Sequence, residues 1–212
     1  MSRPAGGRAE RFEMVATILL AIATVGTAWS GYQASRWNGE QAKAAARASA
    51  LRIQSSKADA LANAQTQVDV LTFTQWVDAY ATGKSELASF YFRRFREEFR
   101  PALTAWVATR PLRNADAPLT PFAMPQYRLD ARAEAERLDT EAEAWTAKAR
   151  VNVQRSTNYV LGVVLFAAAL FFAGISTKLE APRLRQALLG FGLVVFLGTA
   201  IWLATFPVSF SL

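Results

Sequence analysis

The sequence predicts an all-α integral membrane protein with three transmembrane helices and an extended helical extramembrane domain between the first two of them. Three long stretches contain no charged residue. Between the first two stretches, small side chains recur at steps of three and four residues, a spacing that is typical of packed helices. No segment alternates apolar and polar residues over several positions, as a half-buried β-strand would.

The composition excludes several kinds of chemical site. The 212 residues include no Cys and no His, so this sequence holds no disulfide, no Cys/His zinc site and no His-based catalytic triad. Charged residues make up 19% of it, against about 25% in an average soluble domain. The low content of charge indicates that apolar residues are concentrated in parts of the chain.

The first transmembrane helix is predicted at residues 14–33, after an N-terminal tail at 1–13. The uncharged stretch between Glu13 and Arg36 is 22 residues long, and a helix needs about 20 to cross a ~30 Å hydrocarbon core. A cleaved signal peptide is the competing interpretation. Because Glu13 adjoins the apolar stretch and no small-residue cleavage site follows it, we expect an uncleaved anchor.

Two further transmembrane helices are predicted near the end of the sequence. Arg155 and Lys178 bound one uncharged stretch, and the other follows Arg185. Both are too apolar on all sides to be core helices of a soluble protein at this length. The predicted segments are the second helix at 157–177, a short basic loop at 178–187, the third helix at 188–206 and a C-terminal tail at 207–212.

The basic residues predict the orientation in the membrane. Lys and Arg near the membrane ends favour the cytoplasm, and the loop before the third helix carries Lys178, Arg183 and Arg185, whereas no basic residue follows that helix. The two ends of segment 34–156 are basic as well, so some basic residues near the membrane ends lie on the side that we predict to be periplasmic. We predict a multi-pass protein of the bacterial inner membrane, with a cytoplasmic N-terminus and with the helical domain and the C-terminus in the periplasm.

The domain at 34–156 is predicted to consist of three helices and one loop. Its first and last helices carry stripes of small residues, which favour helix pairing within the chain or in an intermolecular bundle. The predicted helices lie at about 36–82, 85–109 and 129–156, with a Pro-rich loop at 110–128. The first stripe is Ala44, Ala48, Leu51, Ser55, Ala58, Ala62 and Gln65, and the second is Ala131, Ala135, Leu138, Ala142, Trp145, Ala149, Asn152, Ser156 and Tyr159.

The predicted helix at 85–109 has an aromatic face and a basic face. Pro101 is expected to kink or restart it. The aromatic face can pack against helix 36–82, or the helix can rest on anionic lipid head groups. Arg93, Arg96 and Arg100 on the basic face are therefore a candidate surface for lipid or for a partner.

Two groups of residues are candidate packing or interface positions. Small residues at steps of four in the first transmembrane helix permit close helix packing, against the other two helices or against a second copy, and they can also line a pore. A Trp and three polar residues follow where this helix leaves the membrane, and they can form a hydrogen-bonded collar or a simple interfacial anchor. The two groups are Ala23, Thr27, Gly31 and Ser35, and Trp37, Asn38, Glu40 and Gln41.

The sequence predicts no catalytic, cofactor-binding or metal-binding residue. The segment Thr82 to Ser85 reads TGKS, like the end of a phosphate-binding loop, but Asp78 stands where that loop requires Gly. A cluster of carboxylates at 134–143 alternates with Arg at helical spacing, which is typical of a solvated, ion-paired face. We therefore predict no cofactor and no bound nucleic acid.

The sequence resembles a group of uncharacterised bacterial inner-membrane proteins that hold a domain of unknown function. The resemblance lies in the stretch 29–42, which reads WSGYQASRWNGEQA, and in the basic turn 178–185. It implies one N-terminal transmembrane helix, a coiled helical region and a C-terminal pair of transmembrane helices. It implies membrane residence and no known reaction.

These observations predict a non-enzymatic integral membrane protein whose helical domain mediates assembly or contact with a partner. The predicted partner is the lipid bilayer; a homo-oligomer stays open as an alternative, and the sequence does not identify a protein partner. The alternative is an oligomeric channel in which the first transmembrane helix lines the pore, with Thr17, Thr24, Thr27 and Ser30 facing water.

Overall fold

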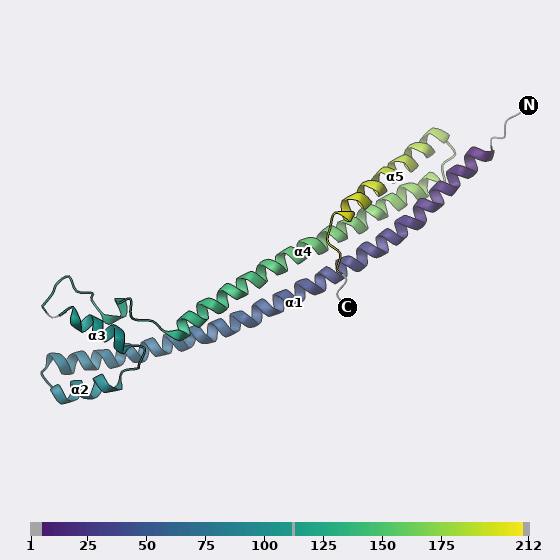
Figure 1. Cartoon of the computed structure of the whole chain (residues 1–212). Helices are drawn as coiled ribbons and strands as arrows, with labels where there is room; N and C mark the ends of the chain where they lie inside the picture. The colour runs from purple at the N-terminus through teal and green to yellow at the C-terminus, as the bar shows by residue number, and fades with distance from the viewer. Residues whose placement is uncertain (1–5, 112, 210–212) are drawn as a thin grey trace, which may run out of the picture. The chain divides into compact units, whose positions relative to one another are not determined.

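The computed structural model describes residues 6–111 and 113–209, and over these residues the chain is all-α (Figure 1). Residues 1–5 of the predicted N-terminal tail and 210–212 of the predicted C-terminal tail lie outside the described residues. The elements are α1 (Gly6–Ala81), α2 (Ser85–Arg94), α3 (Arg100–Ala108), the 3-10 turn η1 (Pro121–Ala123), α4 (Asp130–Ser176) and α5 (Pro182–Ala204).

The chain divides into two compact units. One, which we call the span unit, comprises residues 1–46 and 145–212, and the other, the middle unit, comprises residues 47–144. The helices α1 and α4 each contribute to both units. The span unit contains the three apolar stretches, and the middle unit contains α2, α3 and the Pro-rich segment.

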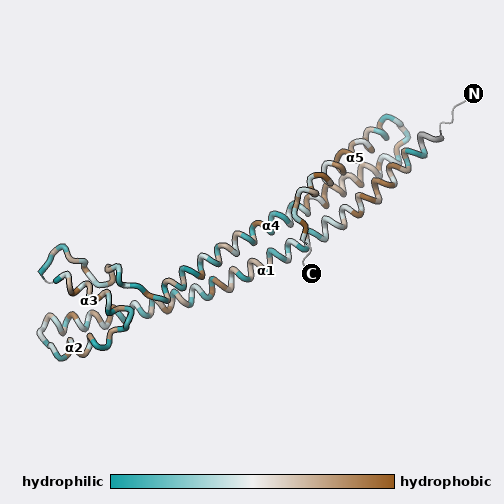
Figure 2. Tube along the Cα trace, in the orientation of Figure 1, coloured by the Kyte–Doolittle hydropathy of each residue, from teal (hydrophilic) through white to brown (hydrophobic). Residues whose placement is uncertain are grey.

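Three helices, α1, α4 and α5, are each long and apolar enough to cross a membrane. Figure 2 shows the apolar residues concentrated in the first part of α1, the last part of α4 and most of α5. The first helix already begins at Gly6, within the predicted tail, and α5 begins at Pro182, six residues before the predicted start of the third transmembrane helix. Proline suits the first turn of a helix, where its missing N–H has no intrahelical partner to lose.

The span unit exposes many large apolar side chains, while small side chains fill much of the space between its helices. Ala23, Ala169 and Ala173 are fully buried between helices, whereas Val194 and Ile201 of α5 are 68% and 69% exposed. A soluble protein rarely exposes so many large apolar residues together, so this surface is unlike that of a water-soluble protein. It is the pattern of helices that meet through small residues and present their large ones to lipid.

Within each unit, α1 and α4 pack against each other in opposite directions. In the span unit the Ser156 hydroxyl donates to the carbonyl of Ala34 at 2.9 Å, and in the middle unit the Ser55 hydroxyl donates to the carbonyl of Ala135 at 2.9 Å. Every residue of the two stripes in the sequence is buried or half-buried. Pairing of these helices within the chain therefore accounts for both stripes.

The helix expected at 85–109 is two helices, because the chain leaves the helical conformation at Phe95 and resumes it at Arg100. The Arg100 side chain donates to the carbonyls of Phe95 at 3.1 Å and of Arg93 at 2.9 Å, which supplies partners to carbonyls at the end of α2. Pro101 lies in the first turn of α3 and is compatible with it, so the interruption precedes the proline.

Candidate functional site

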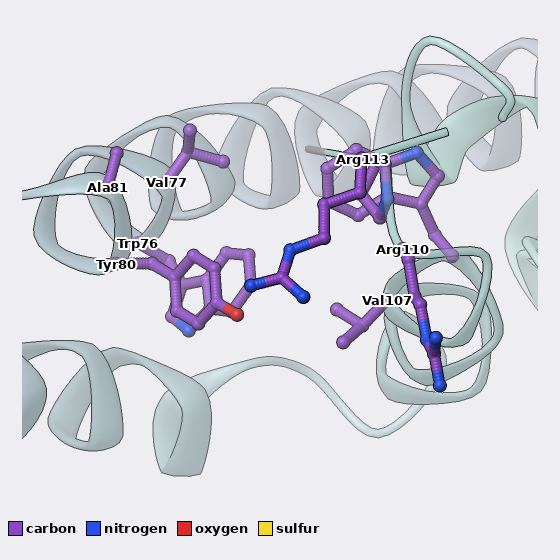
Figure 3. A pocket seen from close by; sticks show the side chains of 9 residues that line it. Trp76, Val77, Tyr80, Ala81, Val107, Arg110 and Arg113 are labelled. Atoms are coloured by element: carbon purple, nitrogen blue, oxygen red, sulfur yellow. The ribbon is translucent and has the colours of Figure 1, made fainter. Parts of the chain in front are cut away.

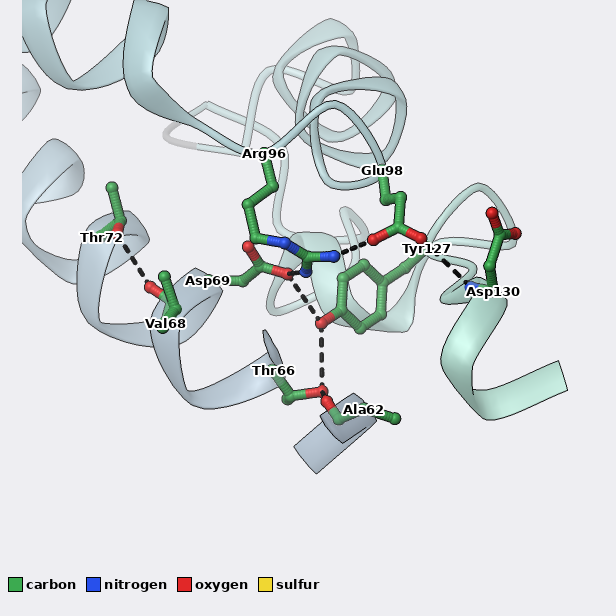
Figure 4. A network of polar contacts seen from close by, with 9 residues as sticks. All are labelled: Ala62, Thr66, Val68, Asp69, Thr72, Arg96, Glu98, Tyr127 and Asp130. Atoms are coloured by element: carbon green, nitrogen blue, oxygen red, sulfur yellow. Dashed lines mark hydrogen bonds and ion pairs between the residues drawn. The ribbon is translucent and has the colours of Figure 1, made fainter. Parts of the chain in front are cut away.

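A buried carboxylate lies inside the middle unit. Asp69 of α1 is 1% exposed, although Val68 and Val70 beside it are exposed. Arg96 donates to Asp69 Oδ2 at 2.8 Å, and the Tyr127 hydroxyl donates to the same oxygen at 3.2 Å (Figure 4). The carboxylate is therefore held by one cationic and one neutral donor from two distant segments.

The hydrogen bonds around Asp69 continue along α1 and to two other parts of the middle unit. The Tyr127 hydroxyl also lies 3.3 Å from Thr66 Oγ1, within hydrogen-bond distance. Arg96 pairs with Glu98 as well, and Glu98 Oε1 accepts the backbone N–H of Asp130, the first residue of α4, at 3.2 Å. This polar network thus connects α1, the segment between α2 and α3, and the start of α4 (Figure 4).

Burial determines the electrostatics of this network. It raises the pKa of the Asp69 carboxyl, because the ionised form loses its hydration, and the Arg96 guanidinium and the Tyr127 hydroxyl offset this effect only in part. Burial also raises the pKa of Tyr127, so the phenol stays protonated and keeps its role as a donor. A buried charge with good partners fixes local geometry more than it adds stability.

An aromatic cluster packs beside the polar network. Phe99 is completely buried, and its ring centroid lies 5.1 Å from that of Phe95, 5.2 Å from that of Phe122 and 5.8 Å from that of Tyr127. Trp76 of α1 belongs to the same cluster. Phe95, Phe99 and Trp106 of the segment 85–109 thus pack in one cluster with Trp76 of α1, the first of the two interpretations of that face. The buried members are Trp76, Ala79, Ala88, Phe95, Phe99, Leu103 and Trp106.

A cavity of about 330 Å³ opens at one edge of the aromatic cluster (Figure 3). One wall belongs to α1 and the other to α3 and the residues that follow it. Arg110 has φ 54°, a left-handed conformation that a non-glycine residue seldom adopts. The residues that line the cavity are Trp76, Val77, Tyr80, Ala81, Trp106, Val107, Arg110, Pro111 and Arg113.

In the span unit, the segment after α5 is fixed by side chains from α1 and α4. Trp37 Nε1 and the Tyr159 hydroxyl both donate to the carbonyl oxygen of Pro207, each at 3.2 Å. Gln33 Oε1 accepts the backbone N–H of Ser209 at 3.0 Å, and Gln33 Nε2 donates to the Ser209 carbonyl at 3.5 Å. We call these five residues the C-terminal clamp.

The four small residues of the first transmembrane helix do not share one environment. Ala23 is buried and Thr27 is half-buried, and the Thr27 hydroxyl donates to the carbonyl of Ala23 at 2.8 Å. Gly31 and Ser35 are exposed. A strict step of four residues drifts around a helix with 3.6 residues per turn, so the four positions pass from the packed face to the outer face.

The four predicted collar residues also differ. Trp37 is buried and belongs to the C-terminal clamp, and the Arg155 guanidinium lies 4.5 Å above its ring. Asn38 is exposed, and Gln41 is half-buried. Glu40 pairs with Lys43 at 2.8 Å, and this hydrogen bond lowers the pKa of Glu40. Of the four, Trp37 alone takes part in the clamp.

Two of the three basic residues proposed as a surface have partners within the middle unit. Arg96 belongs to the polar network, and Arg100 bonds the carbonyls at the end of α2. Arg93 is exposed and lies on α2. Arg96 and Arg100 therefore serve the internal structure, whereas Arg93 stays a candidate surface for lipid or for a partner.

Sequence patterns alone did not identify Gln33, Asp69 or Tyr127 as functional residues. A signal existed for two of them: Gln33 is an amide at the end of an uncharged stretch, and Asp69 is an isolated acid between two valines. Neither signal identifies a partner, because the partners lie 176 residues from Gln33 and 27 and 58 residues from Asp69.

No group of three or more acidic residues that could hold a metal ion occurs among the residues the structure describes. Comparison of the chain with protein-family models, with curated proteins and with solved structures gives no match. The arrangements with defined chemistry are the polar network around Asp69, the cavity beside the aromatic cluster and the C-terminal clamp.

Proposed function

We propose that the chain is a non-enzymatic integral membrane protein, in which three helices anchor a helical domain that mediates assembly or contact with a partner. The observation that carries this proposal is the exposed apolar surface of the span unit. Large apolar side chains are exposed on all three apolar helices, among them Val25 on α1, Phe171 on α4 and Val194 on α5. Lipid is the solvent that makes such a surface stable.

The polar contacts at the two ends of the span unit support an orientation. Arg185, at the start of α5, lies 3.6 Å from Glu13 on α1, so the charges bounding the first and third apolar stretches meet at one end. Trp37, Tyr159 and Phe206 pack together at the other end, as aromatic residues do at a membrane interface. With the basic loop in the cytoplasm, the middle unit is periplasmic in a bacterial inner membrane.

The middle unit exposes apolar residues that its own helices do not cover. Leu71 of α1 is 68% exposed, and Ile53 and Val68 of the same helix are also exposed. Phe90 and Phe92 of α2 are exposed as well. In a domain surrounded by water, such residues are typical of a surface that contacts another protein.

One face of the first transmembrane helix supports self-association. Thr17, Thr24, Gly31 and Ser35 are all exposed, and the first three lie seven residues apart, so they share one side of α1. Small residues on an outer face permit a second copy to approach closely. The same face suits the alternative function, a pore, although Thr24 already donates its hydroxyl hydrogen to the carbonyl of Leu20.

Cysteine labelling tests the membrane arrangement, since the sequence has no native Cys. Single variants Ser2→Cys and Ala117→Cys are treated with an impermeant thiol reagent on intact cells. We expect labelling at position 117 and none at position 2 until the cells are permeabilised. The reverse pattern contradicts the orientation, and extraction of the protein by alkaline carbonate contradicts membrane insertion itself.

Oxidative crosslinking tests self-association. A cysteine introduced as Gly31→Cys on the exposed face should form a covalent dimer in membranes, whereas Ala23→Cys, at a fully buried position, should not. No dimer from Gly31→Cys contradicts association through this face. Ion flux through liposomes that carry the purified chain distinguishes a pore from a simple anchor.

Photo-crosslinking tests contact with another protein. A photoreactive amino acid in place of Leu71 should give an adduct of defined mass in cells, and the same amino acid in place of the exposed polar residue Gln54 should not. Equal yields at both positions would contradict a specific contact surface on α1.

A further inference from the structure

The cavity of the middle unit has the size of a small-molecule site. Its volume is about 330 Å³, at the lower end of the range of ~300–1,000 Å³ that ligand pockets occupy. At ~30 Å³ for each water molecule in the liquid, it has room for about eleven non-hydrogen atoms.

Aromatic rings form the apolar part of the wall. Trp76 and Tyr80 stack with ring centroids 5.1 Å apart and an interplanar angle of 16°. Trp106 lines the opposite side, and its indole Nε1–H donates a hydrogen bond to the carbonyl oxygen of Pro118 at 2.6 Å. Fixed rings of this kind favour a flat apolar ligand, because stacking adds to the area that the ligand buries.

The charged part of the wall is entirely positive. Arg110 and Arg113 line the cavity, and no Asp or Glu does. Neither guanidinium has a hydrogen bond or ion pair within the part of the chain that the structure describes, whereas Arg96, Arg100 and Arg132 of the same unit all have partners. Figure 3 shows the Arg113 guanidinium turned toward Trp76 and Tyr80.

The backbone at Arg110 is held in a conformation that favours glycine. It follows the last residues of α3, and its N–H donates to the carbonyl of Val107 at 3.0 Å. Glycine is the usual residue at such a helix end, so an arginine with φ 54° stores strain. Strain of this kind is common where a binding site requires the side chain.

We propose that this cavity binds a small organic anion with a flat apolar body, of the class of the aromatic carboxylates. The carboxylate pairs with the Arg113 guanidinium, for which a planar two-point contact is the favoured geometry. The ring lies among Trp76, Tyr80 and Trp106. The site is independent of membrane insertion and of any partner of the exposed apolar residues.

The test uses the full chain in phosphatidylcholine nanodiscs and phenylacetate, which has ten non-hydrogen atoms, as the probe. Isothermal titration measures its affinity for the wild type, for Arg113→Gln and for Arg93→Gln, an exposed arginine that does not line the cavity. We expect Arg113→Gln to weaken binding about tenfold or more, because a charge-assisted contact is lost, and Arg93→Gln to leave it unchanged.

Two further ligands separate the contributions of charge and ring. Phenylacetamide has the same shape without the charge, so it should bind the wild type more weakly and should not respond to Arg113→Gln. Acetate has the charge without the ring and should not bind. The proposal is overturned if phenylacetate does not bind the wild type, if it binds Arg113→Gln and Arg93→Gln equally, or if phenylacetamide binds as tightly as phenylacetate.

Discussion

The side chain of Gln33 and the backbone of Ser209 hydrogen-bond to each other in both directions. The Ser209 N–H donates to Gln33 Oε1 at 3.0 Å and Gln33 Nε2 donates to the Ser209 carbonyl at 3.5 Å, while the Gln33 side chain is fully buried. An amide inside a span unit has no water to satisfy it, so the backbone beyond α5 takes the place of water.

Replacing Gln33 should therefore destabilise the C-terminal clamp. Gln33→Met keeps the size of the side chain but leaves the buried N–H and carbonyl of Ser209 unpaired, and we expect a loss of about 1–3 kcal/mol. Thermal unfolding in detergent measures it, with Gln186→Met, at an exposed position of α5, as the control. Equal melting temperatures for the two variants would contradict a structural role for the clamp.

Gly192 should tolerate a side chain less well than Gly198. A Cβ at position 192 would lie 3.2 Å from the carbonyl oxygen of Ala169, which is backbone and cannot move aside, whereas nothing lies within 4 Å of one at position 198. We expect Gly192→Leu to cost about 1–3 kcal/mol and Gly198→Leu to leave the stability nearly unchanged. Unfolding of both variants in the same detergent checks this, and an equal cost would refute close packing of α4 and α5.

Arg110→Gly should stabilise the protein. Glycine adopts φ 54° without strain, and we expect a gain of about 1 kcal/mol. Ala108→Gly, at the last residue of α3, should instead lose stability, by less than this amount, since glycine is a poor helix former. Chemical unfolding followed by tryptophan fluorescence should give shifts of opposite sign, and a loss of stability in both variants would show that Arg110 is unstrained.

Asp69→Asn should change the pH dependence of stability. Because burial raises the pKa of Asp69, the folded chain holds this proton more tightly than the unfolded chain does. The contribution of Asp69 to the free energy of unfolding is fully present below the ordinary pKa of about 4. It is lost as the pH rises through the higher pKa that Asp69 has in the folded chain. Measured by unfolding over this range, the wild type should lose stability relative to Asp69→Asn as the pH increases.

Glu134 serves as a control, because its effect on stability should change with pH in the direction opposite to that of Asp69. The hydrogen bond from Arg137 lowers the pKa of Glu134, so its contribution is present above the ordinary pKa of about 4 and is lost as the pH falls through the lower folded value. The wild type should therefore lose stability relative to Glu134→Gln on acidification. The same pH trend in both comparisons would contradict the assignment of Asp69 as a buried acid.

Local periodicity made much of the fold predictable. The length of the uncharged stretches predicted the three apolar helices. Helical spacing predicted the stripe through Ala135, Leu138 and Ala142, and these three residues of α4 are buried. The interruption before α3 was not predictable in the same way, because it depends on the Arg100 side chain reaching back to the carbonyls of α2. A proline suggested a break nearby but does not fix its position.

The cavity and the polar network depend on contacts that no local pattern encodes. Asp69, Arg96 and Tyr127 come from three separate segments, and their meeting requires the turn after α1, the break before α3 and the return of the chain to α4. The left-handed conformation of Arg110 was likewise not predictable from the sequence, because glycine, and not arginine, is the residue that indicates such a conformation.

The reciprocal bond of Gln33 also constrains how the protein is made. The first apolar helix is synthesised 176 residues before its partner Ser209 leaves the ribosome. Until then the Gln33 amide needs other hydrogen-bond partners, such as water, lipid head groups or an insertion factor. The contacts of Gln33 are therefore completed only after α5 has been made, and a deletion that removes Ser209 would leave the buried amide of the first apolar helix without its partner.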